Sequence, residues 1–267
     1  MNKAVTADPS LASPWVTIQK PNPRALIRMF CFPYAGGGAP IFHNWADSLP
    51  TDIEVCVVQM PGRGRRLSEA PYGNITNLVK GAADGLTPFL DKPFVSVGHS
   101  MGAIISFELA RFLRKSRNLQ PSWLFVSGRR APHMPDPTPP IHELPDPELI
   151  EKLQKLNGTA TEVLENPELM QLMLPLLRVD FALCRSYEHS DEPPLDCPIT
   201  ALGGLEDQEV SAESVEAWKQ YTTKSFHFKM LSGDHFFINT ARAPFLRILF
   251  RDLMHLLMTS GKAGLPR

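Results

Sequence analysis

Ser100 is the residue whose surroundings point most directly to chemistry. It stands at the centre of a Gly-x-Ser-x-Gly pattern that runs from Gly98 to Gly102. The apolar run 93–97 before it is of strand type, and residues 103–113 after it read as a helix buried on most of its surface. So tight a turn strains the serine backbone, and the two glycines permit it because they lack a Cβ atom. The pattern predicts a nucleophilic hydroxyl raised above a sheet edge. The alternative is an ordinary serine in a glycine-rich turn.

Asp207 and His235 follow Ser100 in the order nucleophile, acid, base. A serine hydroxyl is a poor nucleophile at neutral pH, so it needs a base to accept its proton and a third group to orient that base. Asp207 comes directly after one expected strand and His235 lies in a glycine-led loop after another, at the strand ends where α/β sheets present their sites. Glu206 competes with Asp207 as the acid. The alternatives are a surface acidic turn, and a helix-capping turn in which Asp234 is the cap and His235 a bystander.

Two backbone amides are needed to bind the negative charge that develops on a reacting carbonyl oxygen. One is expected from Met101, the residue after the nucleophile. The other is expected from the loop after the first main strand, where Ala35 is favoured and Tyr34 is the runner-up. The glycines 36–38 let this backbone approach a substrate closely. The loop is not a phosphate loop, because no Lys-Ser/Thr pair follows, and it lacks the spacing and distal acid of a dinucleotide site.

Strands and helices alternate through much of the chain. The expected strands are 25–32, 53–58, 93–97, 123–127, 198–202 and 225–231, and the expected core helices are 41–49, 75–90, 103–113 and 241–258. Such alternation builds a mostly parallel central sheet flanked by helices on both faces, so the fold class is α/β. With a nucleophilic serine on a strand-to-helix turn, the pattern is typical of the α/β-hydrolase fold.

The alternation stops in the segment 129–197. Seven prolines between 132 and 147 prevent regular structure early in it. After them, 148–156 and 167–185 read as amphipathic or apolar helices, so a helical lid insertion is expected. The expected division of the chain is a loose N-terminal arm, 1–24, an α/β-hydrolase core, 25–128 and 198–267, and the helical lid, 129–197.

Composition argues against several classes of partner. The 267 residues carry 27 Lys+Arg against 28 Asp+Glu, a formal net charge of −1. This balance gives no support for nucleic acid or an anionic membrane. No apolar stretch reaches the roughly 18 residues of a membrane span, and the polar N-terminus has no signal-type apolar region, so a cytoplasmic protein is expected. The four cysteines form no Cys-x-x-Cys pair, which favours reduced buried thiols over disulfides or a metal site.

The other seven histidines carry weaker signals. His99 lies inside the Gly-x-Ser-x-Gly turn and is expected to pack beneath it. His227 alternates within an expected strand. Only His133 is retained as a candidate pocket-lining residue.

Taken together, these residues resemble the type II thioesterases of polyketide and nonribosomal peptide synthesis, and the related medium-chain fatty-acyl thioesterases. The resemblance spans nearly the whole chain and shows no departure at a catalytic position. Its motifs are the first loop 31–37, the Gln-x-Pro-Gly-Arg element 59–63, the turn 98–102, the lead into the lid 127–132, the lid helix 174–181 with Tyr187, and the acid and base segments 203–207 and 233–236.

The resemblance implies an enzyme that hydrolyses acyl groups from the phosphopantetheine arm of an acyl or peptidyl carrier protein, which frees a stalled synthase. It implies a monomer that needs no metal or redox cofactor, since the substrate carries the phosphopantetheine. The apolar inner face of the lid would line an acyl pocket. The implied substrate-binding residues are Tyr34, Arg63, Met173, Leu177 and Phe181.

Arg63, Arg129 and Arg130 are expected to receive the acidic carrier protein or the phosphate of its arm. Ordinary solvated charge is the alternative for each of them. Three other functions compete with the thioesterase interpretation: a carboxylesterase, lipase or acyltransferase with the same triad, a release domain cut from a synthase, and a catalytically inactive hydrolase fold that only binds.

Overall fold

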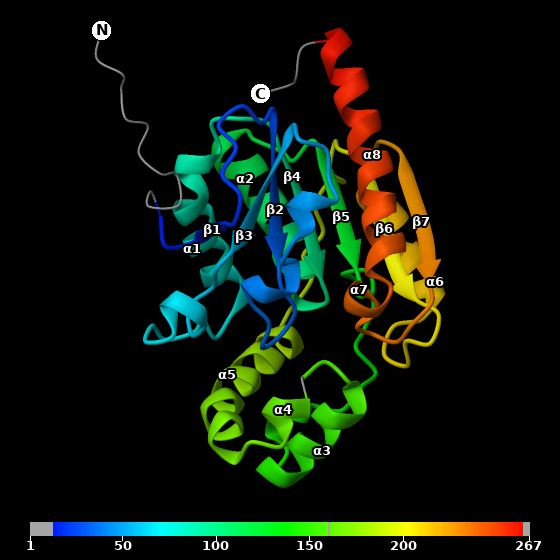
Figure 1. The fold of residues 1–267 in the computed structure, drawn as a ribbon. Helices are drawn as coiled ribbons and strands as arrows, with labels where there is room; N and C mark the ends of the chain where they lie inside the picture. The colour runs from blue at the N-terminus through cyan, green and yellow to red at the C-terminus, as the bar shows by residue number, and fades with distance from the viewer. Residues whose placement is uncertain (1–12, 160, 264–267) are drawn as a thin grey trace, which may run out of the picture.

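The computed structural model describes residues 13–159 and 161–263, and a seven-stranded sheet forms its centre (Figure 1). The strands lie in the order β1-β3-β2-β4-β5-β6-β7. Their bounds are β1 (Val16–Ile18), β2 (Ile27–Phe32), β3 (Ile53–Val58), β4 (Phe94–His99), β5 (Trp123–Ser127), β6 (Ile199–Gly204) and β7 (Phe226–Leu231). Only the β1–β3 pair is antiparallel within the described residues. The predicted α/β class with a mostly parallel sheet is confirmed.

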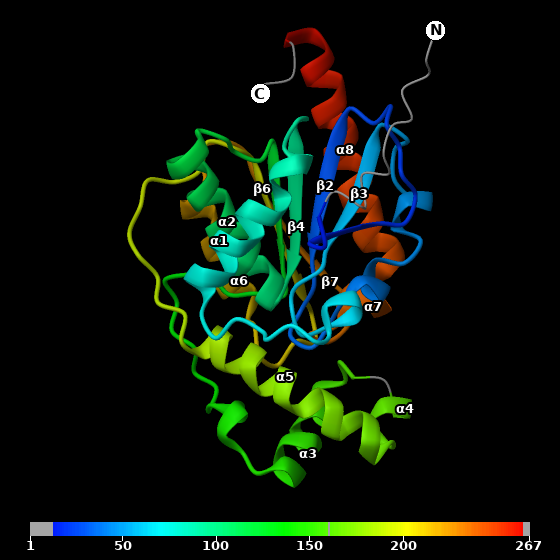
Figure 2. The same ribbon diagram turned by 90° about the vertical axis from the view of Figure 1, so that its left-hand side faces the viewer.

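Helices cover both faces of this sheet (Figure 2). The core helices are α1 (Ile75–Leu86), α2 (Met101–Arg117), α6 (Ala212–Glu216), α7 (Phe237–Thr240) and α8 (Arg242–Ala263). The helices α1, α2 and α6 pack on one face in a cluster that includes Phe30 and Val126. On the other face, α8 packs with the short 3-10 helices 39–42 and 45–47 around Trp45 and Phe245. Strands β2 to β6 are buried along their whole length, because both faces are covered.

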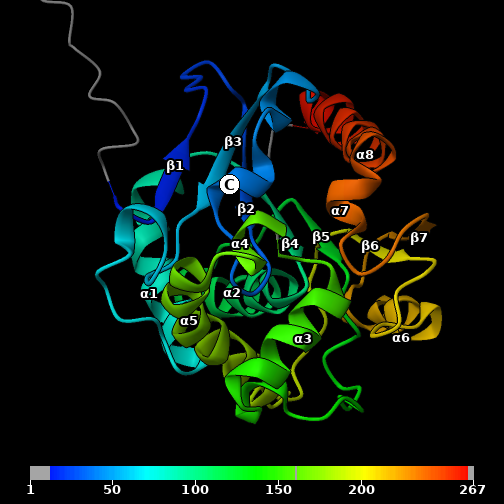
Figure 3. The same ribbon diagram turned by 60° about the horizontal axis from the view of Figure 1, so that its bottom comes forward.

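The insertion forms a layer of its own beyond the C-terminal ends of the strands (Figures 1 and 3). Its helices are α3 (Asp146–Leu156), α4 (Thr161–Leu164) and α5 (Pro167–Arg185). Leu149, Leu153 and Leu174 belong to a separate small apolar core. The helix α5 begins where the Asn166 side chain accepts hydrogen bonds from two backbone amides, with proline at the first helical position. The two predicted lid helices are therefore present.

Two local predictions are wrong. Part of the segment expected as a loose arm is ordered: Val16–Ile18 forms β1, and the Trp15 ring stacks under the Arg66 guanidinium at 4.1 Å. The first 12 residues of that arm lie outside the described residues. The single helix expected over 41–49 is instead two 3-10 turns, because Asn44 between them has a left-handed backbone with φ of 60°.

Two further observations concern the chain as a whole. The cysteines of the described region are free thiols, and Cys31, Cys56 and Cys197 are buried as predicted, with Cys184 half-buried. Among the described helices, none combines the length and apolar character needed to cross a membrane.

Candidate active site

Ser100 stands where β4 ends and α2 begins, in the strained turn that the sequence predicts. Its φ of 54° and ψ of −114° are rare for a residue other than glycine. A Cβ on Gly98 would lie 2.1 Å from the carbonyl oxygen of Gly102, and a Cβ on Gly102 would lie 2.1 Å from that of Phe32. The Ser100 amide donates to the Ser127 carbonyl at 2.7 Å. The strained turn is therefore held by β5, and glycine is required on both sides of the serine.

Ser100, His235 and Asp207 form one hydrogen-bonded line. His235 Nε2 lies 2.9 Å from Ser100 Oγ, and His235 Nδ1 lies 2.7 Å from Asp207 Oδ2. A carboxylate can only accept, so Nδ1 carries the proton and Nε2 presents its lone pair to the hydroxyl. This is the arrangement that lets a histidine accept the proton of an attacking serine.

Asp207 is held in its ionised form by its surroundings. Its side chain is fully buried, and its Oδ1 accepts hydrogen bonds from the amides of Glu209 at 2.8 Å and Val210 at 3.1 Å. Burial by itself raises the pKa of a carboxyl group. The hydrogen bond and charge of His235, together with the two amides, outweigh burial and keep the pKa of Asp207 below its ordinary value.

The two alternatives for the acid and base segments are resolved by geometry. Glu206 is exposed and accepts a hydrogen bond from the Gly233 amide, so it does not face the histidine. Asp234 does cap its turn, since its Oδ1 accepts from the Phe236 amide at 2.8 Å. His235 is nevertheless no bystander, because both ring nitrogens are engaged at the site.

His99 fastens the loop of His235 to the serine turn. The His99 ring is fully buried, as predicted. Its Nε2 lies 2.9 Å from the backbone oxygen of His235, and its Nδ1 lies 2.9 Å from Ser127 Oγ. A carbonyl only accepts, so Nε2 carries the proton and Nδ1 accepts from the hydroxyl. Burial, reinforced by the charge of His235, lowers the pKa of His99 to about 3, so this ring is neutral at ordinary pH.

The two predicted oxyanion amides are available. Met101 opens α2, and Ala35 lies in the loop after β2 and lines the cavity at Ser100. Within the described residues, neither amide donates to another protein group. By contrast, the next amide in the loop, Gly36, is occupied: it donates to Asp180 Oδ2 at 2.7 Å. The Gly37 amide is occupied too, since it donates to the Tyr34 carbonyl at 2.9 Å. The loop thus has the Gly36 and Gly37 amides occupied and the Ala35 amide free.

A cavity of about 130 Å³ opens onto Ser100 and His235 between the core and the lid. The insertion supplies Ile141, Leu153, Leu156, Leu177 and Phe181 to its apolar lining, and the core supplies Ala35, Val210 and Phe236. Of the predicted substrate-binding residues, Tyr34, Leu177 and Phe181 line this cavity. Met173 does not line it, although it packs on the same small apolar core of the lid as Leu177 and Phe181.

Arg63 and Arg130 are wrong as predicted docking groups, because both are buried and paired. Arg63 Nη2 lies 2.8 Å from Asp180 Oδ1, and the exposed fractions of the two side chains are 7% and 4%. Arg130 donates to the Glu209 carbonyl at 2.6 Å and pairs with Asp136. A docking arginine needs an exposed and unpaired guanidinium, and these two positions do not provide one.

Arg129 differs from these two arginines. It is only partly buried and forms no ion pair with an acid of the described chain. Arg129 lines both the cavity at Ser100 and a second cavity on the α2 side, as Arg130 does, so the difference between the two is the missing ion pair. Arg129 is thus the member of the predicted set that remains open to a ligand.

Sequence reasoning missed the lid residues that touch the catalytic loops. Asp180 binds the loop after β2, as described above. At the other end of the lid, Asn157 Nδ2 donates to Asp234 Oδ2 at 3.1 Å. A Cβ on Gly158 would lie 1.9 Å from the Phe236 ring. The available signal was Asp180, the one acid in the apolar stretch 169–185, which stands three residues after Leu177.

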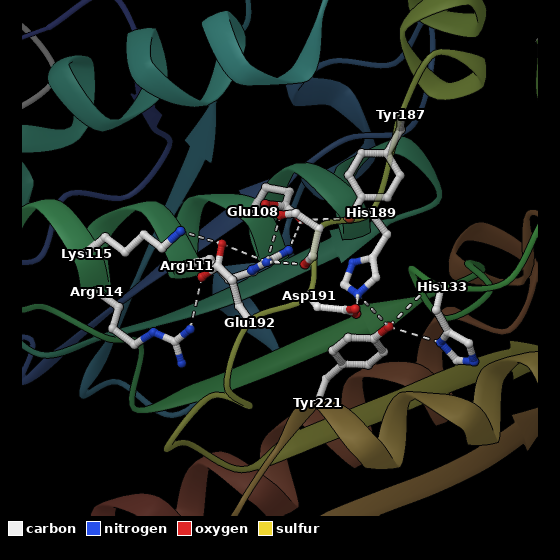
Figure 4. Close-up of polar contacts among 11 residues, drawn as sticks. Glu108, Arg111, Arg114, Lys115, His133, Tyr187, His189, Asp191, Glu192 and Tyr221 are labelled. Atoms are coloured by element: carbon white, nitrogen blue, oxygen red, sulfur yellow. Dashed lines mark hydrogen bonds and ion pairs between the residues drawn. The ribbon is translucent and has the colours of Figure 1, made fainter.

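His133 does line a cavity, as the sequence indicated, but it is the second cavity on the α2 side and not the cavity at Ser100. It lies in a polar cluster between α2 and the segment 186–197, which returns the chain from the lid to the sheet (Figure 4). We call this cluster the return network; its members are Glu108, Arg111, Arg114, Lys115, His133, Tyr187, His189, Asp191, Glu192 and Tyr221. His133 Nδ1 lies 3.0 Å from Tyr221 Oη.

Comparison with known proteins agrees with this geometry. A family model described as "Thioesterase domain" matches residues 27–253. The chain is 43% identical to Linear gramicidin dehydrogenase LgrE of Brevibacillus parabrevis, over 92% of this chain and 95% of that protein. It is also 43% identical to Gramicidin S biosynthesis protein GrsT of Aneurinibacillus migulanus, over 91% and 95%. The solved structure of RedJ, a thioesterase from the prodiginine biosynthetic pathway in Streptomyces coelicolor, has a TM-score of 0.81 at 40% identity, over 85% of this chain and 90% of that one. The predicted α/β-hydrolase fold is confirmed.

The word dehydrogenase in the first relative's name has no counterpart in this site. The glycines 36–38 lack the Gly-x-Gly-x-x-Gly spacing of a dinucleotide loop. Gly36 also lies against α5, where Leu177 and Asp180 contact it.

Proposed function

The chain belongs to the thioesterase family, and from this premise we propose that it hydrolyses acyl groups from the phosphopantetheine arm of carrier proteins in polyketide or nonribosomal peptide synthesis. Its role would be to clear aberrant or stalled chains. The observation that carries the proposal is the line Ser100–His235–Asp207, with contacts of 2.9 and 2.7 Å, which opens into a lid-covered cavity. GrsT and RedJ are named for gramicidin S and prodiginine biosynthesis, which supports an assembly-line substrate.

In the proposed acylation step, Ser100 Oγ attacks the thioester carbonyl while His235 Nε2 accepts its proton. The negative charge on the carbonyl oxygen is bound by the amides of Ala35 and Met101. Collapse of this intermediate breaks the C–S bond, and His235 returns the proton to the departing thiol. Asp207 keeps the ring of His235 in the required tautomer and stabilises its protonated form.

In the proposed deacylation step, His235 accepts a proton from water, which attacks the ester formed on Ser100. The same two amides bind the second oxyanion, and the protonated His235 gives its proton back to Ser100 Oγ. The products are a free carboxylic acid and regenerated enzyme. These groups complete the reaction without a metal or a redox cofactor, because the thiol-bearing phosphopantetheine belongs to the substrate.

The proposed partner is an acyl or peptidyl carrier protein, and Arg129 is the arginine that we propose meets its anionic groups. Arg63 and Arg130 already have protein partners, whereas Arg129 lines the cavity at Ser100 with no acid paired to it in the described residues. Arg129→Gln is therefore expected to raise KM for substrates that contain the arm phosphate, with little change for an acyl-N-acetylcysteamine, which lacks it.

The decisive test is hydrolysis of acetyl, medium-chain and long-chain groups on a phosphopantetheinylated carrier protein. Wild type and Ser100→Ala are compared, with simple esters of the same acids as controls. Carrier hydrolysis that is lost in the variant supports a Ser100 thioesterase, and the chain-length profile measures the acyl pocket. Ester cleavage without carrier turnover would contradict the proposal and favour an esterase.

A further inference from the structure

We infer that Asp180 of the lid is a positioning residue for the oxyanion loop, which we define as residues 34–37. In this inference the seating of α5 on the core sets the geometry of the oxyanion hole. The inference rests on the proposed function, since an oxyanion hole has a role only if Ser100 attacks a carbonyl group. Asp180 itself does not touch the reacting atoms.

One carboxylate holds the loop directly and through an arginine. Asp180 Oδ2 accepts from the Gly36 amide at 2.7 Å, and Asp180 Oδ1 lies 2.8 Å from Arg63 Nη2. The same guanidinium donates from Nη1 to the Gly37 carbonyl at 3.2 Å. The two side chains are only 4% and 7% exposed. A turn hydrogen bond from the Gly37 amide to the Tyr34 carbonyl, at 2.9 Å, closes the loop on itself. The buried ion pair, whose carboxylate belongs to the lid, fixes the Gly36 and Gly37 backbone of this turn relative to α5.

A second contact from α5 reaches the same glycine. Leu177 lies three residues before Asp180, so both side chains project from one face of the helix. A Cβ on Gly36 would lie only 2.5 Å from Leu177 Cδ2, and the φ of Gly36 is +71°. Glycine thus allows both the backbone turn and the close approach of the lid helix.

These contacts bear on Ala35 through the rigid peptide units. The anchored Gly36 N–H shares a planar peptide with the carbonyl of Ala35. The free Ala35 amide belongs to the preceding peptide, so only the two backbone dihedrals of Ala35 separate it from the anchor. Anchoring Gly36 therefore limits the directions in which the Ala35 amide can point, which matters because oxyanion donors act by being oriented before the reaction.

Stability alone does not explain a buried pair at this place. A buried ion pair is often no more stabilising than apolar side chains of the same volume, because both charges lose their hydration. An apolar pair at 63 and 180 could fill the space between α5 and the loop after β3. It could not accept the hydrogen bond of the Gly36 amide, and that bond is the part of the arrangement that the proposed chemistry requires.

The test compares Asp180→Asn with Glu192→Gln. Both substitutions neutralise a lid or return-segment carboxylate that pairs with a buried arginine, but Glu192 pairs with Arg111, away from the oxyanion loop. Each variant is assayed for kcat and KM on an acyl carrier protein, for the Ki of an alkyl boronic acid, and for its thermal unfolding midpoint. A boronic acid forms a tetrahedral adduct on the serine, so its affinity reports the oxyanion hole.

Asp180→Asn is expected to lower kcat by roughly 10- to 100-fold, to leave KM within about threefold, and to raise the boronate Ki in proportion to the loss in kcat. Glu192→Gln is expected to keep kcat and Ki within about twofold of wild type. An unchanged kcat and Ki in folded Asp180→Asn, or a loss confined to KM, would overturn the inference.

The double variant Arg63→Met/Asp180→Leu separates positioning from stability. It removes both charges together, so it avoids the unpaired buried charge that a single substitution leaves. Its unfolding midpoint is expected to recover towards wild type while kcat and boronate affinity stay low. Recovery of all three would show a structural role only and would overturn the inference. Wild-type failure on the carrier substrate would instead contradict the proposed function, and the boronate comparison would still test Asp180.

Discussion

The insertion is fastened to the core by buried arginines in two places, and the two fastenings differ in what else they touch. At the lid, Arg63 pairs with Asp180 at 2.8 Å. In the return network, Arg111 lies 2.7 Å from Glu108 and 2.7 Å from Glu192 (Figure 4). Both arginines are almost completely buried, and both connect segments that are far apart in the chain.

The return network closes on itself. Arg111 also donates to the Ser190 carbonyl, Glu108 accepts from Tyr187 Oη at 2.7 Å, and Glu192 pairs with Lys115 at 2.7 Å. None of these contacts reaches the cavity at Ser100. The Asp180 carboxylate, in contrast, keeps one oxygen for a backbone amide next to Ala35. The same class of interaction is structural in one place and bears on chemistry in the other, because only one lies beyond the C-terminal ends of the strands.

The largest expected contrast between the two regions concerns the nucleophile. Ser100→Ala should reduce kcat by on the order of 10⁶, because no other group of the line can attack the carbonyl. Glu108→Gln in the return network should leave kcat of the folded enzyme unchanged. Steady-state hydrolysis of an acyl carrier protein measures both. Residual Ser100→Ala activity close to wild type would remove the serine from the mechanism.

Asp207, the acid that orients His235, should give the second largest effect on kcat. Asp207→Asn should lower kcat by about 10⁴, because an amide can donate to His235 Nδ1 and so favour the tautomer that cannot accept the serine proton. The matched substitution Glu206→Gln alters the exposed carboxylate of the preceding residue and should change kcat little. Equal losses in the two variants would show that the choice of Asp207 over Glu206 is wrong.

Breaking the return network should affect folding and leave chemistry intact. Arg111→Met leaves Glu108 without its cation, while Glu192 keeps Arg114 and Lys115. The free energy of unfolding should therefore fall by about 1–3 kcal/mol. Denaturant unfolding measures this loss, and kcat per folded molecule should stay at the wild-type value. A drop in kcat without a loss of stability would mean that the network acts on the site after all.

The smallest effect is the pH dependence that the two regions share. Burial opposes ionisation of Asp207 and Glu192, but hydrogen bonds and nearby cations outweigh it, so both pKa values lie below the ordinary ones. A depressed carboxyl pKa stabilises the fold above the pKa of the unfolded chain, and this stabilisation is lost as pH falls through the folded pKa. The unfolding free energy should therefore decrease below about pH 5.

Variants with a neutral side chain at 192 or 207 test how much each carboxylate contributes to the pH dependence of the unfolding free energy. In Glu192→Gln and in Asp207→Asn, unfolding free energies measured across the acidic range should depend less on pH than in wild type. A slope identical to wild type in both variants would assign the acid sensitivity to other carboxylates.

Short-range patterns determined much of this protein from sequence alone. The apolar runs predicted β2 to β6, because strands buried on both faces are continuously hydrophobic. The half-buried β7 was predicted from its alternating pattern. The Gly-x-Ser-x-Gly turn predicted Ser100, since only glycine fits against the neighbouring strand and helix. The order of Asp207 and His235 along the chain, each after a strand, predicted their meeting at one sheet edge.

Tertiary structure decided whatever depends on a partner distant in the chain. The strand β1 is too short for periodicity to detect and exists because it pairs with β3. The exposed Glu206 and the buried Asp207 are neighbours with the same chemistry, and only the loop geometry turns one of them towards His235. Arg63 reads as a surface cation until Asp180, 117 residues further along the chain, buries and pairs it. The hydrophobic pattern of a segment indicates which of its faces is buried. It does not indicate which distant segment packs against that face, and these contacts depend on that packing.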